Sequence, residues 1–204
     1  MEKGQALEFC ASKLKVYTCD NTSEKVLFSG LTSWQLVNLS VDVILSLPED
    51  LHTQCGVSQD FLGKVLKPFL VQEQGKDGLL RKYSVREPQY LISATRHYSW
   101  PKSAGECYFP LESLSINPVS ALTGIGADNV VNIPVDTQAR MSIDKLRGEL
   151  QKHLDDEQPV YAVVAVIGTT EEGAVDPLDK VIELRDEFKQ KGLSFVVHAD
   201  AACE

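Results

Sequence analysis

The chain has 204 residues, 43% of them hydrophobic and 24% charged, which is typical of a globular protein with one sizeable domain or two small ones. Its net charge of -9 argues against a nucleic-acid-binding protein, because such proteins usually present a basic face. No apolar run is long enough to span a bilayer, and the first ten residues lack the apolar segment of a signal peptide, so we expect a cytoplasmic protein.

The first part of the chain, residues 1–88, is predicted to be helical with a closing loop. Helices are predicted at three places: the end of one over 1–17, and two more within 32–50 and 57–72. Ser33 and Ser58 stand where the N-caps of the second and third helices are expected, and Pro48 follows the predicted end of the second. The polar, glycine-containing stretch 73–88 is predicted to be a surface loop.

From residue 89 onward the chain alternates between strand and helix patterns. Strands are predicted at 89–94, 129–135, 160–168 and 193–200. Amphipathic helices are predicted at 142–158 and 177–192. The continuous apolar run at 160–168 is typical of a strand buried on both faces of a parallel sheet. This order predicts an α/β fold with a mostly parallel sheet flanked by helices.

Polar segments follow three of the predicted strands: "SATRHYSWPK", "GTTEEG" and "HADAA". Ligands of parallel α/β sheets bind at the carboxyl ends of the strands, so we expect these segments to form the site. No GxGxxG sequence follows a strand and no Walker A sequence is present, which argues against a dinucleotide-binding or P-loop protein. The five cysteines have no CxxC spacing, so reduced thiols are expected and no metal site is predicted.

Three of these motifs carry a resemblance to a known family. "RHYSWPKSA", "VVAVIGTTEEGAVDPLDKV" and "FVVHADAA" occur in the order found in group II pyridoxal-phosphate-dependent decarboxylases, and the pattern is most similar to fungal members that resemble tyrosine decarboxylase. The resemblance implies the large domain of a fold-type I enzyme that uses pyridoxal 5′-phosphate to decarboxylate an amino acid, a small-molecule substrate. It also implies a homodimer for a complete family member.

The resemblance also implies roles for individual residues. Asp200 matches the carboxylate beside the cofactor ring nitrogen, where an opposite charge favours the protonated ring. His97 matches the catalytic histidine that stacks on the ring near the departing carboxylate. Thr170 matches the threonine near the cofactor, with Thr169 as the choice if the motif is shifted by one residue. Ala202 matches the small residue beside the ring.

Two other residues of these motifs are given lesser roles. His198 shares the parity of Asp200 along the strand and is expected to lie behind the residues that contact the cofactor. Lys102 matches the lysine of the histidine segment, not the lysine that holds the cofactor covalently.

The chain departs from the family pattern in three ways. We expect 1–204 to be a partial cofactor-binding domain, truncated at both ends, that lacks the glycine-rich phosphate-binding turn and the lysine after "DAA". An insertion is expected at 105–120, as a retained intron or as a genuine surface loop. The chain alone is therefore expected to be inactive. An inactive fragment or pseudoenzyme is one alternative, and another fold-type I enzyme, an aminotransferase or lyase, is a second.

Overall fold

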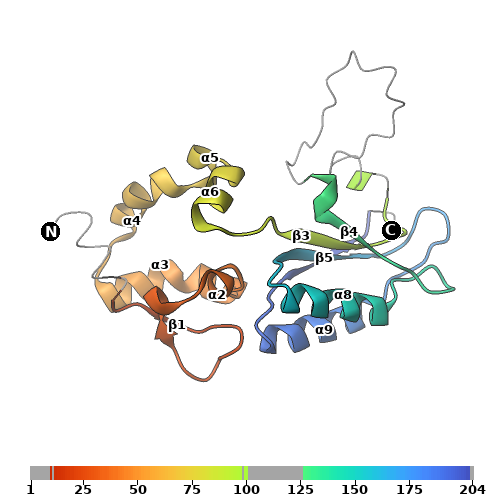
Figure 1. The fold of residues 1–204 in the computed structure, drawn as a ribbon, viewed down its shortest axis with the longest axis horizontal. Coiled ribbons are helices and arrows are strands. Elements are labelled where there is room, and N and C mark those ends of the chain that lie inside the picture. Colours follow the sequence, from red (N-terminus) through yellow and green to blue (C-terminus); the bar gives the residue numbers. More distant parts are fainter. Residues whose placement is uncertain (1–9, 11, 98, 101–125, 203–204) are drawn as a thin grey trace, which may run out of the picture. The chain divides into compact units, whose positions relative to one another are not determined.

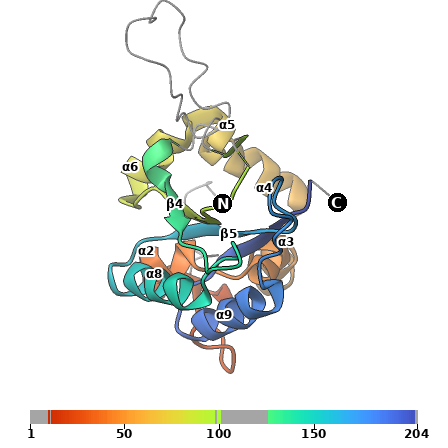
Figure 2. The ribbon, with the colours of Figure 1, turned by 90° about the vertical axis from the view of Figure 1, so that its right-hand side faces the viewer.

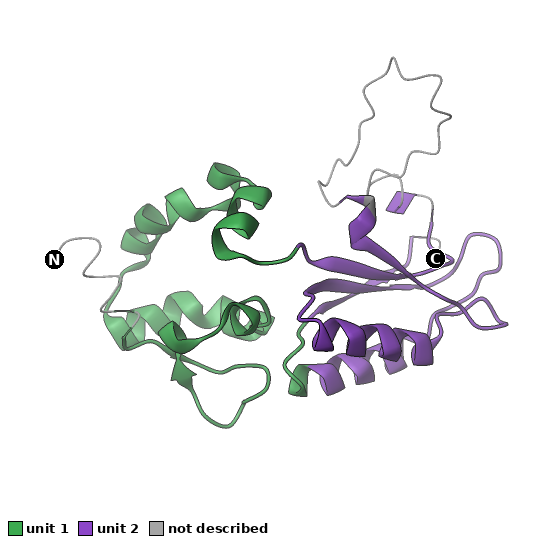
Figure 3. Ribbon diagram, in the orientation of Figure 1, with its two compact units in different colours: residues 1–86, 189–194 green, residues 87–188, 195–204 purple. Residues whose placement is uncertain are grey.

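The computed structural model describes residues 10, 12–97, 99–100 and 126–202. The chain divides into two compact units, shown in Figure 3. Unit 1 contains residues 1–86 together with 189–194, and unit 2 contains residues 87–188 together with 195–204. None of the helices in the described part of the chain combines the length and the apolar composition needed to cross a membrane. The expected insertion at 105–120 and Lys102 lie outside the described residues.

Unit 1 consists of a two-stranded antiparallel ribbon and a series of short helices (Figure 1). Its elements in chain order are β1 (Lys15–Val16), β2 (Val26–Leu27), η1 (Phe28–Gly30), α2 (Ser33–Val37), α3 (Val41–Cys55), α4 (Gln59–Leu66), η2 (Lys67–Phe69), α5 (Val71–Gln74) and α6 (Lys76–Tyr83). Buried Leu14, Val16 and Leu39 form its core, against which side chains of η1 and α3 pack. The predicted helix over 1–17 is wrong at its end, because Lys15 and Val16 pair with the strand β2.

The stretch 32–50 contains two helices instead of the single one predicted. Thr32 caps α2, accepting a hydrogen bond from the Gln35 backbone N–H while the Gln35 side chain accepts from the Thr32 backbone N–H. Asn38 ends α2, because its side-chain amide donates to the Trp34 carbonyl at 2.9 Å. Pro48 lies inside α3, so the prediction that it follows the end of the helix is also wrong.

The next two predictions for unit 1 have opposite outcomes. The helix predicted in 57–72 is confirmed for α4, and the Ser58 hydroxyl accepts a hydrogen bond from the Phe61 N–H as a cap does. The loop predicted at 73–88 is wrong, because α6 occupies much of it. Gly75, with φ at 69°, turns the chain between α5 and α6, and Asp77 in the first turn suits the helix dipole.

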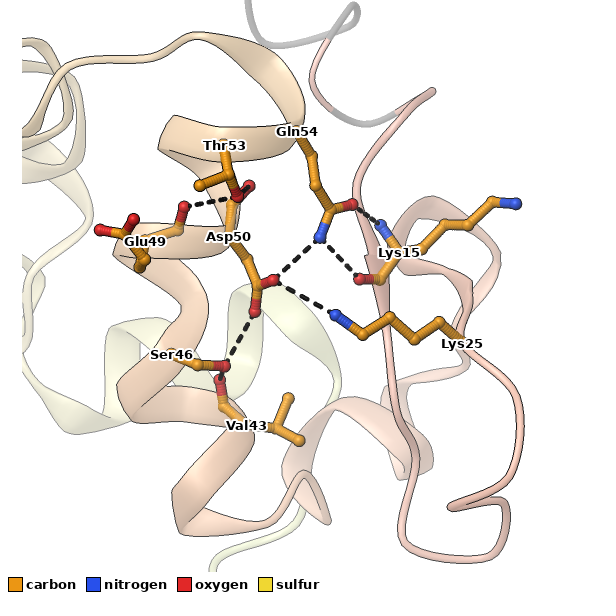
Figure 4. A network of polar contacts seen from close by, with 8 residues as sticks. All are labelled: Lys15, Lys25, Val43, Ser46, Glu49, Asp50, Thr53 and Gln54. Atoms are coloured by element: carbon orange, nitrogen blue, oxygen red, sulfur yellow. Dashed lines mark hydrogen bonds and ion pairs between the residues drawn. The ribbon is translucent and has the colours of Figure 1, made fainter.

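A polar network joins α3 to the strands of unit 1 (Figure 4). The Asp50 carboxylate accepts hydrogen bonds from Ser46, Gln54 and Lys25 at 2.9, 2.9 and 3.3 Å. Gln54 in turn pairs with the backbone N–H and carbonyl of Lys15 in β1. The network therefore fixes helix α3 against the ribbon by side-chain contacts at its polar surface.

Unit 2 contains a four-stranded parallel sheet. Its strands are β3 (Gln89–Ser93), β4 (Val130–Ile133), β5 (Val160–Val166) and β6 (Val196–Asp200), in the order β4-β3-β5-β6. The helix α8 (Ile143–Asp155) connects β4 to β5, and α9 (Leu178–Gln190) connects β5 to β6, while the short η4 (Ala127–Asn129) precedes β4. The predicted strands and both predicted helices of this part are confirmed, and so is the α/β class.

The core of unit 2 lies on both faces of the sheet. Helices α8 and α9 lie on one face (Figure 1 and Figure 2), and their inward side chains Leu146, Leu150, Val181, Leu184 and Phe188 are buried. Another cluster of buried side chains, Ile92, Val130 and Val164, packs with Tyr90 and Trp100. The carboxyl ends of β3, β5 and β6 lie together in the parallel sheet, which is where the expected site segments begin.

Candidate functional site

The segments that follow β3, β5 and β6 enclose a cavity of about 240 Å³ in unit 2. Its lining residues are Thr95, His97 and Ser99 after β3, Val166, Gly168, Thr169 and Thr170 at the end of β5, and Asp200 and Ala202 at the end of β6. These segments are far apart in sequence and are brought together by the pairing of β5 with its two neighbours. The cavity therefore occupies the expected position at the carboxyl edge of a parallel sheet.

The wall that follows β5 is a tight, hydrogen-bonded turn. Gly168 has a φ of 88°, a conformation that favours glycine, and the N–H groups of Gly168 and Thr169 both donate to the Ala174 carbonyl. The Thr169 hydroxyl accepts from the Ala174 N–H at 3.0 Å and donates to Glu172 at 3.2 Å. Thr169 is buried and holds the turn closed, whereas Thr170 is exposed at the cavity.

A buried carboxylate, Asp176, fixes the backbone around this wall. It accepts hydrogen bonds from the Val166 N–H at 2.7 Å, the Met141 N–H at 2.6 Å and the Ser93 hydroxyl at 3.4 Å. Burial raises the pKa of the Asp176 carboxyl, although these three donors act in the opposite direction. The Ser93 hydroxyl also lies 3.0 Å from that of Thr95, so the network reaches the cavity lining.

His97 lies at the cavity with its ring orientation set by Ser99. The backbone N–H of Ser99 donates to His97 Nδ1 at 3.3 Å, and the Ser99 hydroxyl lies 3.0 Å from the same atom. A backbone N–H can only donate, so Nδ1 is an acceptor and a neutral ring carries its proton on Nε2. The ring can therefore present an N–H group through Nε2.

Asp200 is the last residue of β6 and is half-buried at the cavity. Its backbone carbonyl accepts from the Ile167 N–H at 2.8 Å, which ties it to the end of β5. Its Oδ2 atom accepts a hydrogen bond from the Trp100 indole N–H at 2.7 Å. The Trp100 ring in turn meets the ring of His198 edge-on, with centroids 6.0 Å apart.

The structure brings the four predicted site residues together: His97, Thr170, Asp200 and Ala202 all line this cavity. Thr169, the alternative to Thr170, lines it too, but its hydroxyl is engaged within the turn. His198 contacts Trp100 beside Asp200, in agreement with a place behind the cavity lining. The chemical roles assigned to these residues remain predictions.

Sequence reasoning missed Trp100, Asp176 and Thr95. Trp100 and Asp176 were inside the quoted motifs, but a motif match does not show that an indole reaches a carboxylate 100 positions away or that an aspartate is buried. Thr95 lies in the segment "SATRHYSWPK", which was expected to form the site, but immediately before the "RHYSWPKSA" motif that carries the resemblance, so it was not singled out.

The arrangement suits a flat, cationic heteroaromatic ligand. A carboxylate can accept the N–H of a protonated ring nitrogen, an imidazole can stack on a ring face, and the small side chain of Ala202 leaves room beside it. In the described part of the chain, no cluster of three or more His, Cys, Asp or Glu side chains is arranged to hold a metal ion.

The sequence is similar to those of several amino-acid decarboxylases. It is 32% identical to an L-tyrosine decarboxylase of Enterococcus faecium over 193 residues, covering 95% of this chain and 26% of the relative. It is 32% identical to the L-tyrosine decarboxylase of Levilactobacillus brevis over 86% of this chain and 23% of that relative. The chain is homologous to these decarboxylases.

This decarboxylase homologue spans about a quarter of the length of these two curated relatives. An L-2,4-diaminobutyrate decarboxylase of Acinetobacter baumannii is 37% identical over 89 residues, covering 43% of the chain and 16% of the relative. No family model matches the sequence. The predicted resemblance to the decarboxylase family is confirmed, whereas the likeness to fungal members stays a prediction.

Two solved structures are also similar to parts of this chain. Mouse CSAD in its apo form matches with a TM-score of 0.45 and 24% identity, covering 65% of this chain and 23% of that chain. Catharanthus roseus tryptophan decarboxylase in complex with L-tryptophan matches with a TM-score of 0.45 and 23% identity, covering 66% of this chain and 24% of that chain.

Proposed function

We propose that the protein to which this chain belongs is a pyridoxal-phosphate-dependent amino-acid decarboxylase, a carboxy-lyase of the fold-type I kind. The observation that carries the proposal is the meeting of His97, Thr170, Asp200 and Ala202 at one cavity, in a chain homologous to decarboxylases. The proposal includes a cytoplasmic location and a homodimer. The substrate is a small molecule, an amino acid, with L-tyrosine as the first candidate because the relatives described above include L-tyrosine decarboxylases.

Within this proposal, the cavity residues hold the ring end of pyridoxal 5′-phosphate. The cofactor supplies an electron sink that stabilises the carbon from which carbon dioxide departs. Asp200 accepts the N–H of the ring nitrogen and holds the proton there, because a nearby negative charge favours the protonated form. Thr170 and Ala202 form the wall of the cavity beside the ring.

His97 orients the reacting part of the substrate in the proposed mechanism. Because Ser99 donates to Nδ1, the neutral ring presents its N–H at Nε2, and this group can donate to a carboxylate bound in the cavity. The same ring can pack against the cofactor ring and exclude water from it. These are binding and orienting roles, and they need no change in the fold of unit 2.

Cofactor binding by the chain tests this proposal. The purified chain is titrated with pyridoxal 5′-phosphate, and binding is followed by absorbance and by equilibrium dialysis. We expect saturable binding that Asp200→Ala weakens about tenfold or more, because the ring N–H loses a charged acceptor. Asp186→Ala, which removes an exposed carboxylate on α9, is the matched control and should bind as the unsubstituted chain does.

Equal affinity in the Asp200→Ala variant would contradict the role of Asp200, and the absence of saturable binding would contradict the cofactor assignment for this chain. With binding established, product analysis distinguishes the reaction types in the protein to which the chain belongs. Carbon dioxide and an amine are expected from a decarboxylase, whereas a keto acid would indicate an aminotransferase. The absence of any product with bound cofactor would indicate the inactive alternative.

A further inference from the structure

Within the described part of the chain, the Asp200 carboxylate accepts one hydrogen bond, and its donor is Trp100. Its Nε1 atom lies 2.7 Å from Asp200 Oδ2, a distance expected for an N–H donor on a carboxylate oxygen. An indole N–H can only donate, so this contact keeps Oδ2 as an acceptor. The carboxylate retains its second oxygen, which can accept another N–H group.

The indole itself is fixed by packing on one face of the sheet. Its ring packs against the buried cluster formed by Ile92, Val130 and Val164. Its centroid lies 6.2 Å from the Tyr90 ring, in addition to the edge-on contact with His198. A side chain held by apolar and aromatic neighbours keeps its N–H in one direction, which is the condition for orienting a partner.

The sheet register explains why these groups meet. Val164 in β5 pairs with His198 in β6, and Val166 pairs with Asp200. Alternate residues of a strand point to the same face, so His198 and Asp200 share the face on which Trp100 packs. Trp100 therefore connects the apolar cluster beneath it to the polar cavity at the end of β6.

We infer that Trp100 is a positioning residue for Asp200, which holds the carboxylate in the orientation needed to meet the ring nitrogen of the cofactor. The effect of Trp100 on the cofactor rests on the proposed function. The hydrogen bond from Trp100 to Asp200 is independent of that function. Trp100 acts through Asp200. The inference therefore predicts a weaker cofactor interaction when the indole N–H is lost and the ring packing is kept.

The first test detects the hydrogen bond in the chain without cofactor. Trp34 and Trp100 are the two tryptophans of the sequence, so Trp34→Phe leaves a single indole N–H signal in a ¹⁵N–¹H spectrum. In that background we expect Asp200→Ala to shift the remaining signal and to speed its exchange with water roughly fivefold. An unchanged shift and exchange rate would overturn the inference. Asp186→Ala is the matched control and should leave the signal in place.

The second test measures the consequence for the cofactor. Trp100→Phe keeps an aromatic ring but removes the N–H, and we expect it to weaken binding of pyridoxal 5′-phosphate roughly fivefold to tenfold. Trp34→Phe, a change of the same kind in unit 1, should leave the affinity unchanged. Equal affinity in the two variants would overturn the positioning role.

The two tests separate the inference from the proposed function. If the unsubstituted chain does not bind the cofactor, the proposed function fails for this chain. The inference that Trp100 positions Asp200 for a cofactor then fails as well. The indole spectra still show whether Trp100 holds Asp200. If Trp100→Phe does not fold, the Asp200→Ala change in the Trp34→Phe background decides the same point, because it leaves Trp100 intact.

Discussion

Asp176 shows how much of the candidate site depends on a residue that the proposed chemistry does not use. Its carboxylate accepts hydrogen bonds from the backbone N–H groups of Met141 and Val166, and both of these residues are buried. A buried donor that loses its partner costs free energy because water does not replace the hydrogen bond. The stability of the cavity wall should therefore depend on Asp176 more than on the exposed acids of α9.

Replacement of Asp176 tests this dependence. We expect Asp176→Ala to lower the free energy of unfolding by about 2–4 kcal/mol, since two buried N–H groups lose their acceptor. Urea unfolding followed by circular dichroism measures the loss. Asp186→Ala removes an exposed acid nearby in sequence and should change the stability by about 0.5 kcal/mol or less. Equal losses in the two variants would contradict the structural role of Asp176.

At the scale of helices and strands, the stabilisation that the Asp50 network gives to unit 1 should depend on pH. Burial acts to raise the pKa of the Asp50 carboxyl, but hydrogen bonds from Ser46 and Gln54 and the charge of Lys25 outweigh it, so the pKa lies below its ordinary value of 3.8. The stabilisation from this network is therefore complete above pH 3.8 and is lost as the pH falls through the lowered pKa.

The substitution Asp50→Ala should reveal this pH dependence. We expect a loss of about 1–2 kcal/mol near pH 6, because the donors of Figure 4 lose a charged acceptor, and a smaller loss near pH 3. Glu49→Ala is the control, since Glu49 enters this network through its backbone carbonyl, which accepts from Thr53. Urea midpoints at the two pH values give the comparison. An equal loss at both would contradict the role of the ionised carboxylate.

The elements that were predictable from sequence are those whose signal is local. The apolar run of β5 and the amphipathic patterns of α8 and α9 each occupy one continuous stretch, and burial of those stretches follows from their composition. The place of the site was also predictable, since its segments lie at or after the ends of predicted strands and parallel strands bring their carboxyl ends together, whereas the choice of residues within the segments came from the family resemblance.

The features that sequence analysis missed, both helix boundaries and single residues, depend on contacts that composition does not show. Asn38 divides the stretch 32–50 into two helices because its side chain bonds to backbone atoms. The stretch 73–88 is polar and contains two glycines, which conceals the helix α6. Trp100 reaches Asp200 only after the sheet has formed, so its role could not be derived from its neighbours in sequence.

At the scale of the whole molecule, Asn38 joins the N-terminal part of unit 1 to its second segment, 189–194. Its Oδ1 atom accepts the Ser194 N–H at 2.9 Å, across 156 positions of sequence, and its backbone carbonyl lies 2.6 Å from the Cys19 thiol. Asn38 is 2% exposed, so water cannot easily replace these partners. The segment 189–194 therefore belongs to unit 1 through specific polar contacts.

Asn38→Ala should loosen that segment. We expect a loss of about 1–3 kcal/mol in stability, because the Ser194 N–H loses its acceptor, and faster hydrogen exchange at Ser194. Hydrogen-exchange mass spectrometry over 189–194 measures the local effect. Gln190→Ala, at the exposed end of α9, is the control and should leave the exchange at Ser194 unchanged. Unaltered exchange in the Asn38→Ala variant would contradict this link.

The interleaving of the two units has a consequence for how the molecule can be dissected. The chain passes between units at 86/87, 188/189 and 194/195, so a cut in the first connection does not separate them into independent pieces. A shortened chain that starts at Glu87 would retain 189–194 but lose Asn38, the acceptor for Ser194. Studies of the cavity in isolation therefore require a redesigned turn between α9 and β6, in addition to the removal of the N-terminal helices.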